Sequence, residues 1–439
     1  MAETVLAGEQ QRLVSLDAFR GLTIASMVLV NNPGSWAHMY APLGHAQWDG
    51  WTPTDFVFPF FLFIVGVAMT FSFDKRIGAG ADRWRMFAHV VRRSAILIIL
   101  GFSIGAFSGG KWWNMTSYAM MLAGFWFVFS REPLFSFGET AADKRNKLLG
   151  WGLLGGGVIL FLASLGEFGS QRIPGVLQRI AWCYFGVSII MLLTSWKGRL
   201  LWAIVIVWGY WIIMRYFDAP EGYEMARRDP PEGVPFPGKL NDWLDTQIFG
   251  DNLYRRRPDP EGLLSTLPAM ATVLVGTLTG TWLKTAWERR DKVIGMACMG
   301  GVLILAGLCM ETFFPINKKI WSSSFVVFTA GWAMTILAVC YYFIDVKMWK
   351  RWSLPLVVFG TNAILLFWAS TIMALTMSRY IRFTVDEETI ALRTWLYRNI
   401  YTANIETPEL ASFMWGISYV ILWCLLLYPL YRKKIFLKV

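Results

Sequence analysis

The stretch TDFVFPFFLFIVG, from Thr54 to Gly66, is apolar after its first two residues. It opens an apolar run of about 20 residues, the length that an α-helix needs to cross the hydrocarbon core of a bilayer. A short polar segment comes directly before it and carries His45, one of three histidines in the chain. The sequence therefore predicts a membrane helix with a titratable side chain at its mouth.

The composition of the whole chain agrees with that helix. Hydrophobic residues make up 55% of the 439 residues and charged residues only 16%, whereas soluble proteins contain roughly a quarter charged residues. We therefore predict an all-α polytopic membrane protein, formed by residues 1–439 as one domain, with about twelve transmembrane helices. The expected spans are 13–33, 55–73, 87–107, 112–130, 147–166, 174–195, 199–217, 262–283, 292–313, 322–344, 353–375 and 410–431.

The distribution of Lys and Arg sets the expected orientation. With the N-terminus inside, every inner loop is basic, while the outer segment 34–54 has no Lys or Arg, in line with the positive-inside rule. Both termini are then cytoplasmic and His45 lies outside. The same rule accounts for the net charge of +11, so we predict no nucleic-acid partner. Of the two longer outer loops, 218–261 and 376–409, the first holds seven prolines and is expected to be irregular and not helical.

Several other kinds of site are excluded by the residue pattern. The five cysteines lie in apolar runs and form no CxxC pair, so we expect buried thiols, not disulfides or metal ligands. His38 is the only other outer histidine, and no cluster has metal-ligand spacing with it, so we expect no metal. The polar N-terminal segment MAETVLAGEQQRL is not expected to be a cleaved signal peptide.

Charged residues inside predicted spans are candidates for function, because burying them is costly. Asp17 and Arg20 lie three residues apart near the cytoplasmic start of the first span, where they can pair on one helix face. They form either a neutralised structural pair or part of a pocket for an anionic ligand.

Further polar residues gather where spans meet the outer surface. The candidates are Gln178 and Arg179, Asp259 and Glu261, the group Asn317, Lys318, Trp321 and Ser323, and the isolated Asn31 and Asn362. Structural pairing or helix capping is the alternative to lining a site. His45 itself is either a solvated side chain or a general base, since an unperturbed imidazole titrates at about pH 6.5.

Taken together, several blocks resemble the heparan-α-glucosaminide N-acetyltransferase family of transmembrane acetyltransferases, including its bacterial members. The blocks are RLVSLDAFRG, HAQWDG followed by TDFVFPFFLFIVG, RIPGVLQRI, DPEGLLST, NKKIWSSSFVVFTAG, GTNAIL and the terminal LYRKKIF. The resemblance implies a multi-pass protein of the bacterial inner membrane. Such a protein would move acetyl from cytoplasmic acetyl-CoA to the amine of glucosamine, or of a glucosamine-containing saccharide, on the periplasmic side.

The resemblance also assigns roles to residues. The family's active histidine maps to His45, as general base or transient acetyl carrier, and an asparagine maps to Asn31; Asp259 or Glu261 would hold the ammonium or orient the imidazole. Saccharide contacts are expected from Trp48, Asp49, Gln178, Arg179, Asn317, Lys318, Trp321, Ser323 and Asn362. Coenzyme A phosphates are expected near Asp17, Arg20, Arg92, Arg93, Lys433 and Lys434.

This chain departs from the family in two expected ways. It lacks the family's lumenal N-terminal extension and extra leading span, and residues 108–170 are expected to be an inserted helix pair. A homodimer is compatible with the sequence. Two other functions stay open: an inner-membrane transporter of N-acetylglucosamine or a related sugar, although we find no internal repeats, and an acyltransferase acting on a cell-envelope glycan.

Overall fold

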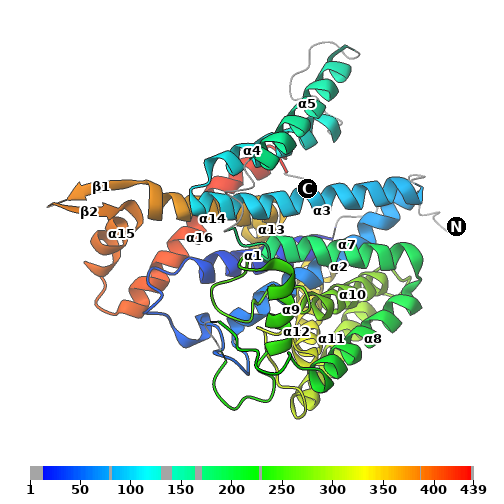
Figure 1. The fold of residues 1–439 in the computed structure, drawn as a ribbon. Helices are drawn as coiled ribbons and strands as arrows, with labels where there is room; N and C mark the ends of the chain where they lie inside the picture. Colours follow the sequence, from blue (N-terminus) through cyan, green and yellow to red (C-terminus); the bar gives the residue numbers. More distant parts are fainter. Residues whose placement is uncertain are drawn as a thin grey trace.

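The fold is a bundle of long helices, described here from a computed structural model (Figure 1). The structure describes residues 13–78, 82–129, 141–163, 171–226, 230–385 and 387–436. Within these residues the only sheet is a two-stranded antiparallel hairpin, β1 (Arg382–Val385) with β2 (Glu388–Ala391). The prediction of an all-α polytopic membrane protein is therefore confirmed.

Ten segments of the described chain are long and apolar enough to cross a membrane, and they correspond to ten of the twelve predicted spans. They are built on α1 (Val14–Asn31), α2 (Val57–Gly78), α3 (Arg83–Gly109), α7 (Val176–Leu193), α8 (Trp196–Tyr216), α10 (Thr266–Leu283), α11 (Arg289–Glu311), α12 (Ser323–Tyr341), α14 (Ala363–Leu375) and α16 (Pro408–Arg432).

The segment expected to be an inserted pair holds α4 (Trp112–Phe129) and α5 (Ala141–Ala163). The two helices form a hairpin that projects from the bundle (Figure 1), and the Ser117 hydroxyl donates to the Gly157 carbonyl across it at 2.9 Å. Neither helix is among the ten spanning segments of the described chain, and the apolar helical stretch in α5 is shorter, Lys147–Ala163.

The predicted span 353–375 is broken in the middle. A short turn η4 (Arg351–Ser353) leads into α13 (Leu354–Thr361), and Asn362 separates α13 from α14. Asn362 is buried, and its amide donates to the Ile435 carbonyl at 3.1 Å, which ties the C-terminal turn to the break. Gly360 lies against the α1 backbone, where an added Cβ would be 1.9 Å from the Asp17 carbonyl oxygen.

The loop 218–261 contains a helix, α9 (Lys239–Phe249), so the expectation of an entirely non-helical loop is wrong. Its prolines lie on either side of this stretch, and Leu240, Asp242 and Asp245 form a buried face. The other long loop, 376–409, folds into η5 (Thr376–Tyr380), the β1–β2 hairpin, α15 (Leu392–Leu396) and η6 (Tyr397–Thr402).

The helix α2, with its first turn η2 (Pro53–Phe56), lies at the centre of the bundle, and its apolar residues face α1, α10 and α12. Where α2 crosses α10, the backbones of the two helices are in direct contact. A Cβ on Gly276 would lie 2.1 Å from the Phe63 carbonyl oxygen, and one on Gly66 would lie 2.0 Å from the Val273 carbonyl oxygen. Small residues permit this approach, and Gly276 and Gly280 lie at the GxxxG spacing that is common where membrane helices pack closely.

We predict that Gly276→Val prevents α2 and α10 from meeting. The added side chain collides with backbone, which cannot yield as a flexible side chain can, so we expect a loss of at least about 1–3 kcal/mol. Gly209→Val on α8 is the matched control, because an added Cβ there would have nothing within 4 Å of it. Thermal unfolding of both purified variants in detergent measures the difference, and equal stability would contradict this packing.

Candidate functional site

His45 lies in a loop that is fastened to the start of α2. The turn η1 (Ala41–Leu43) comes just before it. The Thr52 hydroxyl donates to the Gly44 carbonyl at 2.6 Å, and the Thr54 hydroxyl donates to the Pro42 carbonyl at 3.1 Å. Two threonines of the helix start thereby fix the backbone on the N-terminal side of the histidine.

The side chain of His45 is held by Asp55. Its Nδ1 lies 2.7 Å from Asp55 Oδ1. The second carboxylate oxygen accepts from the Ala46 and Thr52 backbone amides, at 3.1 and 3.0 Å. Asp55 is only 1% exposed while half of the His45 side chain is open to solvent. The carboxylate therefore orients an accessible imidazole and caps the first turn of the helix at the same time.

Sequence reasoning missed Asp55 as a site residue. The signal was present in TPTDF, where a threonine and an acidic residue are three positions apart at the start of an apolar run. This spacing predicts a helix cap. The second role of the carboxylate, orienting His45, cannot be predicted from it, because only the folded loop brings His45 next to Asp55.

Lys318 completes a group of three charged or titratable side chains. Its ammonium lies 3.2 Å from Asp55 Oδ1 and 3.0 Å from His45 Nδ1. Burial lowers the pKa of Lys318, with Asp55 acting in the opposite direction. Asp55 Oδ1 can only accept and the Lys318 ammonium can only donate, so their two contacts with Nδ1 favour opposite tautomers of His45. In the tautomer that donates Nδ1–H to Asp55, the available lone pair is on Nε2.

These residues face a cavity of approximately 620 Å³. Among the predicted site residues, His45, Trp48, Glu261 and Lys318 line it. The remaining lining residues are Ala46, Gln47, Asp55, Arg172, Pro231, Tyr254, Arg256, Pro260 and Lys319. The loop 41–55, the segment 171–175, the 218–261 loop and the turn before α12 thus meet at one polar cavity.

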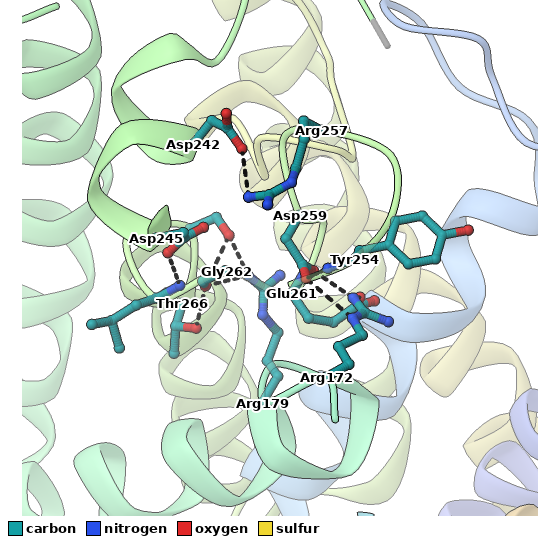
Figure 2. A network of polar contacts seen from close by, with 12 residues as sticks. Arg172, Arg179, Asp242, Asp245, Tyr254, Arg257, Asp259, Glu261, Gly262 and Thr266 are labelled. Carbon is teal, nitrogen blue, oxygen red and sulfur yellow. Dashed lines mark hydrogen bonds and ion pairs between the residues drawn. The ribbon is translucent and has the colours of Figure 1, made fainter. Parts of the chain in front are cut away.

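Another part of the cavity wall is built around Arg172, which sequence reasoning also missed. Its Nε donates to Asp259 at 3.1 Å and its Nη2 contacts both Asp259 and Glu261, the latter at 2.5 Å (Figure 2). The guanidinium also stacks on the Tyr254 ring, 4.6 Å from its centroid. The two carboxylates raise the pKa of Arg172 against the effect of burial. Asp259 is thereby used structurally, and Glu261 is the acidic residue of this wall that reaches the cavity.

A second group of charged residues lies next to this network (Figure 2). The fully buried Arg179 donates to the Gly262 carbonyl at 2.9 Å and to the Ser265 hydroxyl, and lies over the Trp321 ring. Asp245 accepts from the Leu263 amide at 2.8 Å. Arg179 and Trp321 therefore support the turn that presents Glu261 and do not line the cavity.

The polar group before α12 supports its own turn. Asn317 accepts from the Lys319 and Ile320 amides and donates to Asp49 at 3.1 Å. Ser323 donates to the Val207 carbonyl at 2.6 Å. Asn317, Asp49 and Ser323 thus hold the segment that carries Lys318, and only Lys318 of this predicted group faces the cavity.

Three further predicted residues lie elsewhere. Asn31 is exposed at the end of α1 and is not among the lining residues. Gln178 is buried against α3, where a Cβ on Gly101 would meet its side chain at 2.3 Å. Asn362 lies at the break between α13 and α14.

The residues expected to meet coenzyme A lie toward the other end of the bundle, in two places. The predicted Asp17–Arg20 pair is present at 3.1 Å, and Arg20 also donates to the Gly360 carbonyl. Asn362, two positions after Gly360, holds the C-terminal turn that follows Lys433 and Lys434. Arg93 lies over the Tyr184 ring between α3 and α7, and Arg92 is on the same helix.

Comparison with known proteins gives two findings. Residues 12–172, which include His45 and Asp55, match a family described as a domain of unknown function, DUF5009. The chain is 26% identical over 481 residues to heparan-alpha-glucosaminide N-acetyltransferase from Homo sapiens, and 24% identical over 486 residues to the protein of that name from Mus musculus. Each match covers 98% of this chain and 60% of the relative.

The predicted family resemblance is confirmed. It extends over nearly the whole chain, and this chain spans about 60% of the length of the heparan-alpha-glucosaminide N-acetyltransferases that it matches.

The Arg172 network yields a stability prediction. Arg172→Met removes the cation between Asp259 and Glu261, whose side chains are 0% and 14% exposed. Leaving buried carboxylates unpaired costs about 3–5 kcal/mol, and the 31% exposure of Arg172 places the expected loss at the lower end. The control Arg398→Met breaks a pair with Glu388 in which both side chains are more than half exposed, and should cost less than about 1 kcal/mol. Similar losses in thermal unfolding would contradict the role of Arg172.

The buried Asp245 yields a pH prediction. Burial, together with the nearby Asp259 and Asp242, raises the pKa of Asp245 to about 7. In the folded protein Asp245 therefore keeps a proton that it releases in the unfolded chain above about pH 4. The free energy of unfolding then falls as the pH rises from about 4 through 7. In melting curves between pH 5 and 8, Asp245→Asn should flatten this dependence and be more stable than wild type at pH 8. Parallel curves for the two proteins would contradict the assignment.

Proposed function

We propose that the protein is a transmembrane N-acetyltransferase. It moves the acetyl group from cytoplasmic acetyl-CoA to the amine of glucosamine, or of a glucosamine-containing saccharide, on the periplasmic side. The observation that carries the proposal is the His45–Asp55 pair at the edge of a polar cavity of approximately 620 Å³. The similarity to named N-acetyltransferases over 98% of the chain supports the reaction class.

The first requirement of the reaction is a neutral amine. Glucosamine enters as an ammonium, and His45 Nε2 accepts its proton in the tautomer whose Nδ1–H is directed to Asp55. His45 releases this first proton to solvent, and the amine nitrogen attacks the thioester carbonyl carbon. As the C–N bond forms, the imidazole takes the second proton from nitrogen; the C–S bond breaks and the thiolate of coenzyme A leaves. The second proton passes from the imidazole to the thiolate, which restores His45.

The second requirement is stabilisation of charge. The carbonyl oxygen becomes negative as the tetrahedral intermediate forms, and a cation beside the base stabilises it. Lys318, 3.0 Å from His45 Nδ1, is the donor that we assign to this role. Glu261, which lines the same cavity and is fixed by Arg172, would hold the ammonium before proton transfer.

The third requirement is a route for the donor. The nucleotide phosphates cannot enter hydrocarbon, so they stay at the cytoplasmic end, where Arg20 and the Lys433–Lys434 turn lie. A continuous row of rings joins that end to the histidine loop: Trp51 to Phe56 at 5.2 Å, Phe56 to Phe60 at 5.4 Å, and Phe60 to Phe19 at 5.6 Å. These aromatic residues of α2 and its neighbours would line the path of the acyl arm.

Two routes use the same residues. In the direct route His45 acts only as a base. In the covalent route His45 Nε2 attacks the thioester first, the thiolate leaves, and the acetyl group passes from the imidazole to the amine. Incubation with acetyl-CoA alone separates them, because only the covalent route releases one thiol per protein before any acceptor is added.

The activity test uses purified protein in detergent with acetyl-CoA and glucosamine, followed by free-thiol release. We expect His45→Ala to abolish release and Asp55→Asn to lower kcat by about 100-fold or more with little change in KM, because the imidazole loses its orienting partner. His38→Ala is the matched control. His38 is an outer-loop histidine whose only described ionic neighbour is Glu409 at 3.9 Å, and the variant should retain full activity.

The opposite results would reject the proposal. If no amino sugar produces thiol release, and the protein in liposomes takes up N-acetylglucosamine without acetyl-CoA, then transport is the function. If thiol release occurs with envelope glycans but not with free amino sugars, the acceptor class is wrong and the reaction class stands.

A further inference from the structure

A second cavity, of approximately 420 Å³, lies at the opposite end of α2 from His45. It is formed where the start of α1, the end of α10, the start of α11 and the turn after α12 come together. Its lining residues are Leu13, Phe71, Leu283, Lys284, Arg289, Lys292, Tyr341, Asp345, Met348 and Lys350. The charge distribution of the sequence assigns this end to the cytoplasm.

The charged residues of this cavity are mostly positive. Four cations, Lys284, Arg289, Lys292 and Lys350, come from three separate segments and face one carboxylate, Asp345. That carboxylate accepts from the Ser15 backbone amide at 3.1 Å. The cavity thus carries an excess of three positive charges.

The backbone holds the cations in place. Arg289 donates to the Asp345 carbonyl oxygen at 2.8 Å. The α12 helix ends in a wide turn, η3 (Tyr342–Val346), closed by the Lys347 amide on the Tyr342 carbonyl. Met348 follows with φ of 58°, a left-handed conformation that is costly for a side chain other than glycine. This turn directs Met348 and Lys350 to the cavity that Lys284 and Lys292 line from the other side.

We propose that this cavity binds a phosphate ester at the cytoplasmic surface of the membrane. The cations match a phosphodiester or phosphomonoester, and apolar neighbours such as Leu13, Phe71 and Leu283 match the first carbons attached to it. Basic pockets between helices at this depth are sites for anionic lipid headgroups. The ligand is therefore an anionic phospholipid headgroup or the nucleotide end of coenzyme A.

Geometry distinguishes these two sources. Asp55 and Phe71 are 16 residues apart along one helix, which corresponds to about 24 Å. A nucleotide in this cavity would have to extend its acetyl arm over that distance to reach His45, as the proposed function requires of a donor bound at the cytoplasmic end. The lipid source needs no such reach, whereas the nucleotide source rests on the proposed function.

The test measures binding to the purified, delipidated protein. Native mass spectrometry compares phosphatidylglycerol with phosphatidylcholine, and calorimetry measures adenosine 3′,5′-diphosphate as the nucleotide probe. We expect the probe that binds wild type to bind the double variant Arg289→Gln/Lys292→Gln about 30-fold more weakly. This factor corresponds to the loss of about 1 kcal/mol for each of the two cations near the membrane. The matched control is Arg290→Gln, an exposed neighbour that does not line the cavity.

Each outcome is informative. Loss of phosphatidylglycerol binding in the double variant, but not in the control, establishes the lipid; loss of nucleotide binding establishes the nucleotide. If neither anionic probe binds wild type better than phosphatidylcholine, or if the double variant binds like wild type, the proposal is overturned. Should the double variant fail to fold, Lys350→Gln in the exposed turn replaces it. Binding needs no turnover, so failure of the acetyltransferase proposal leaves this result unaffected.

Discussion

The His45 end of the molecule depends on one constraint. The carboxylate of Asp55 is buried away from solvent. A buried carboxylate is costly unless it is fully hydrogen-bonded and paired. Asp55 meets that requirement with the backbone amides of Thr52 at its own helix start and Ala46 in the histidine loop, with the imidazole of His45 and with the ammonium of Lys318. The same bonds that make its burial possible bring the His45 loop and the start of α2 together with the turn before α12, which is far away in the sequence.

The other structural features support that meeting point. The close crossing of Gly276 with α2 fixes the helix whose first turn carries Asp55. Arg172 neutralises Asp259 and Glu261 and thereby fixes another part of the cavity wall, while the buried Arg179 supports the turn next to it. The site is therefore rigid where it must orient an imidazole, and open only in the cavity. Rigid support of this kind is what precise placement of reacting groups requires.

The helices were predictable because their signal is local: apolar length and loop charge identified ten of the spanning segments. Within the candidate site, Lys318 and Glu261 were found from their position at span ends, and both line the cavity. Asp55 and Arg172 were missed because their partners are set by the folded loops, and no local pattern distinguishes a cap or a loop arginine with a second role. Helix α9 was missed because the flanking prolines concealed a short amphipathic stretch.

The central claim is that an acetyl group crosses from one end of the bundle to the other, and sidedness tests it directly. Protein in sealed liposomes is given acetyl-CoA inside and glucosamine outside, with leakage followed by a trapped dye. For molecules oriented with His45 outward, the account predicts N-acetylglucosamine in the outer medium and coenzyme A retained within. Product that forms only when donor and acceptor are on the same side would contradict it.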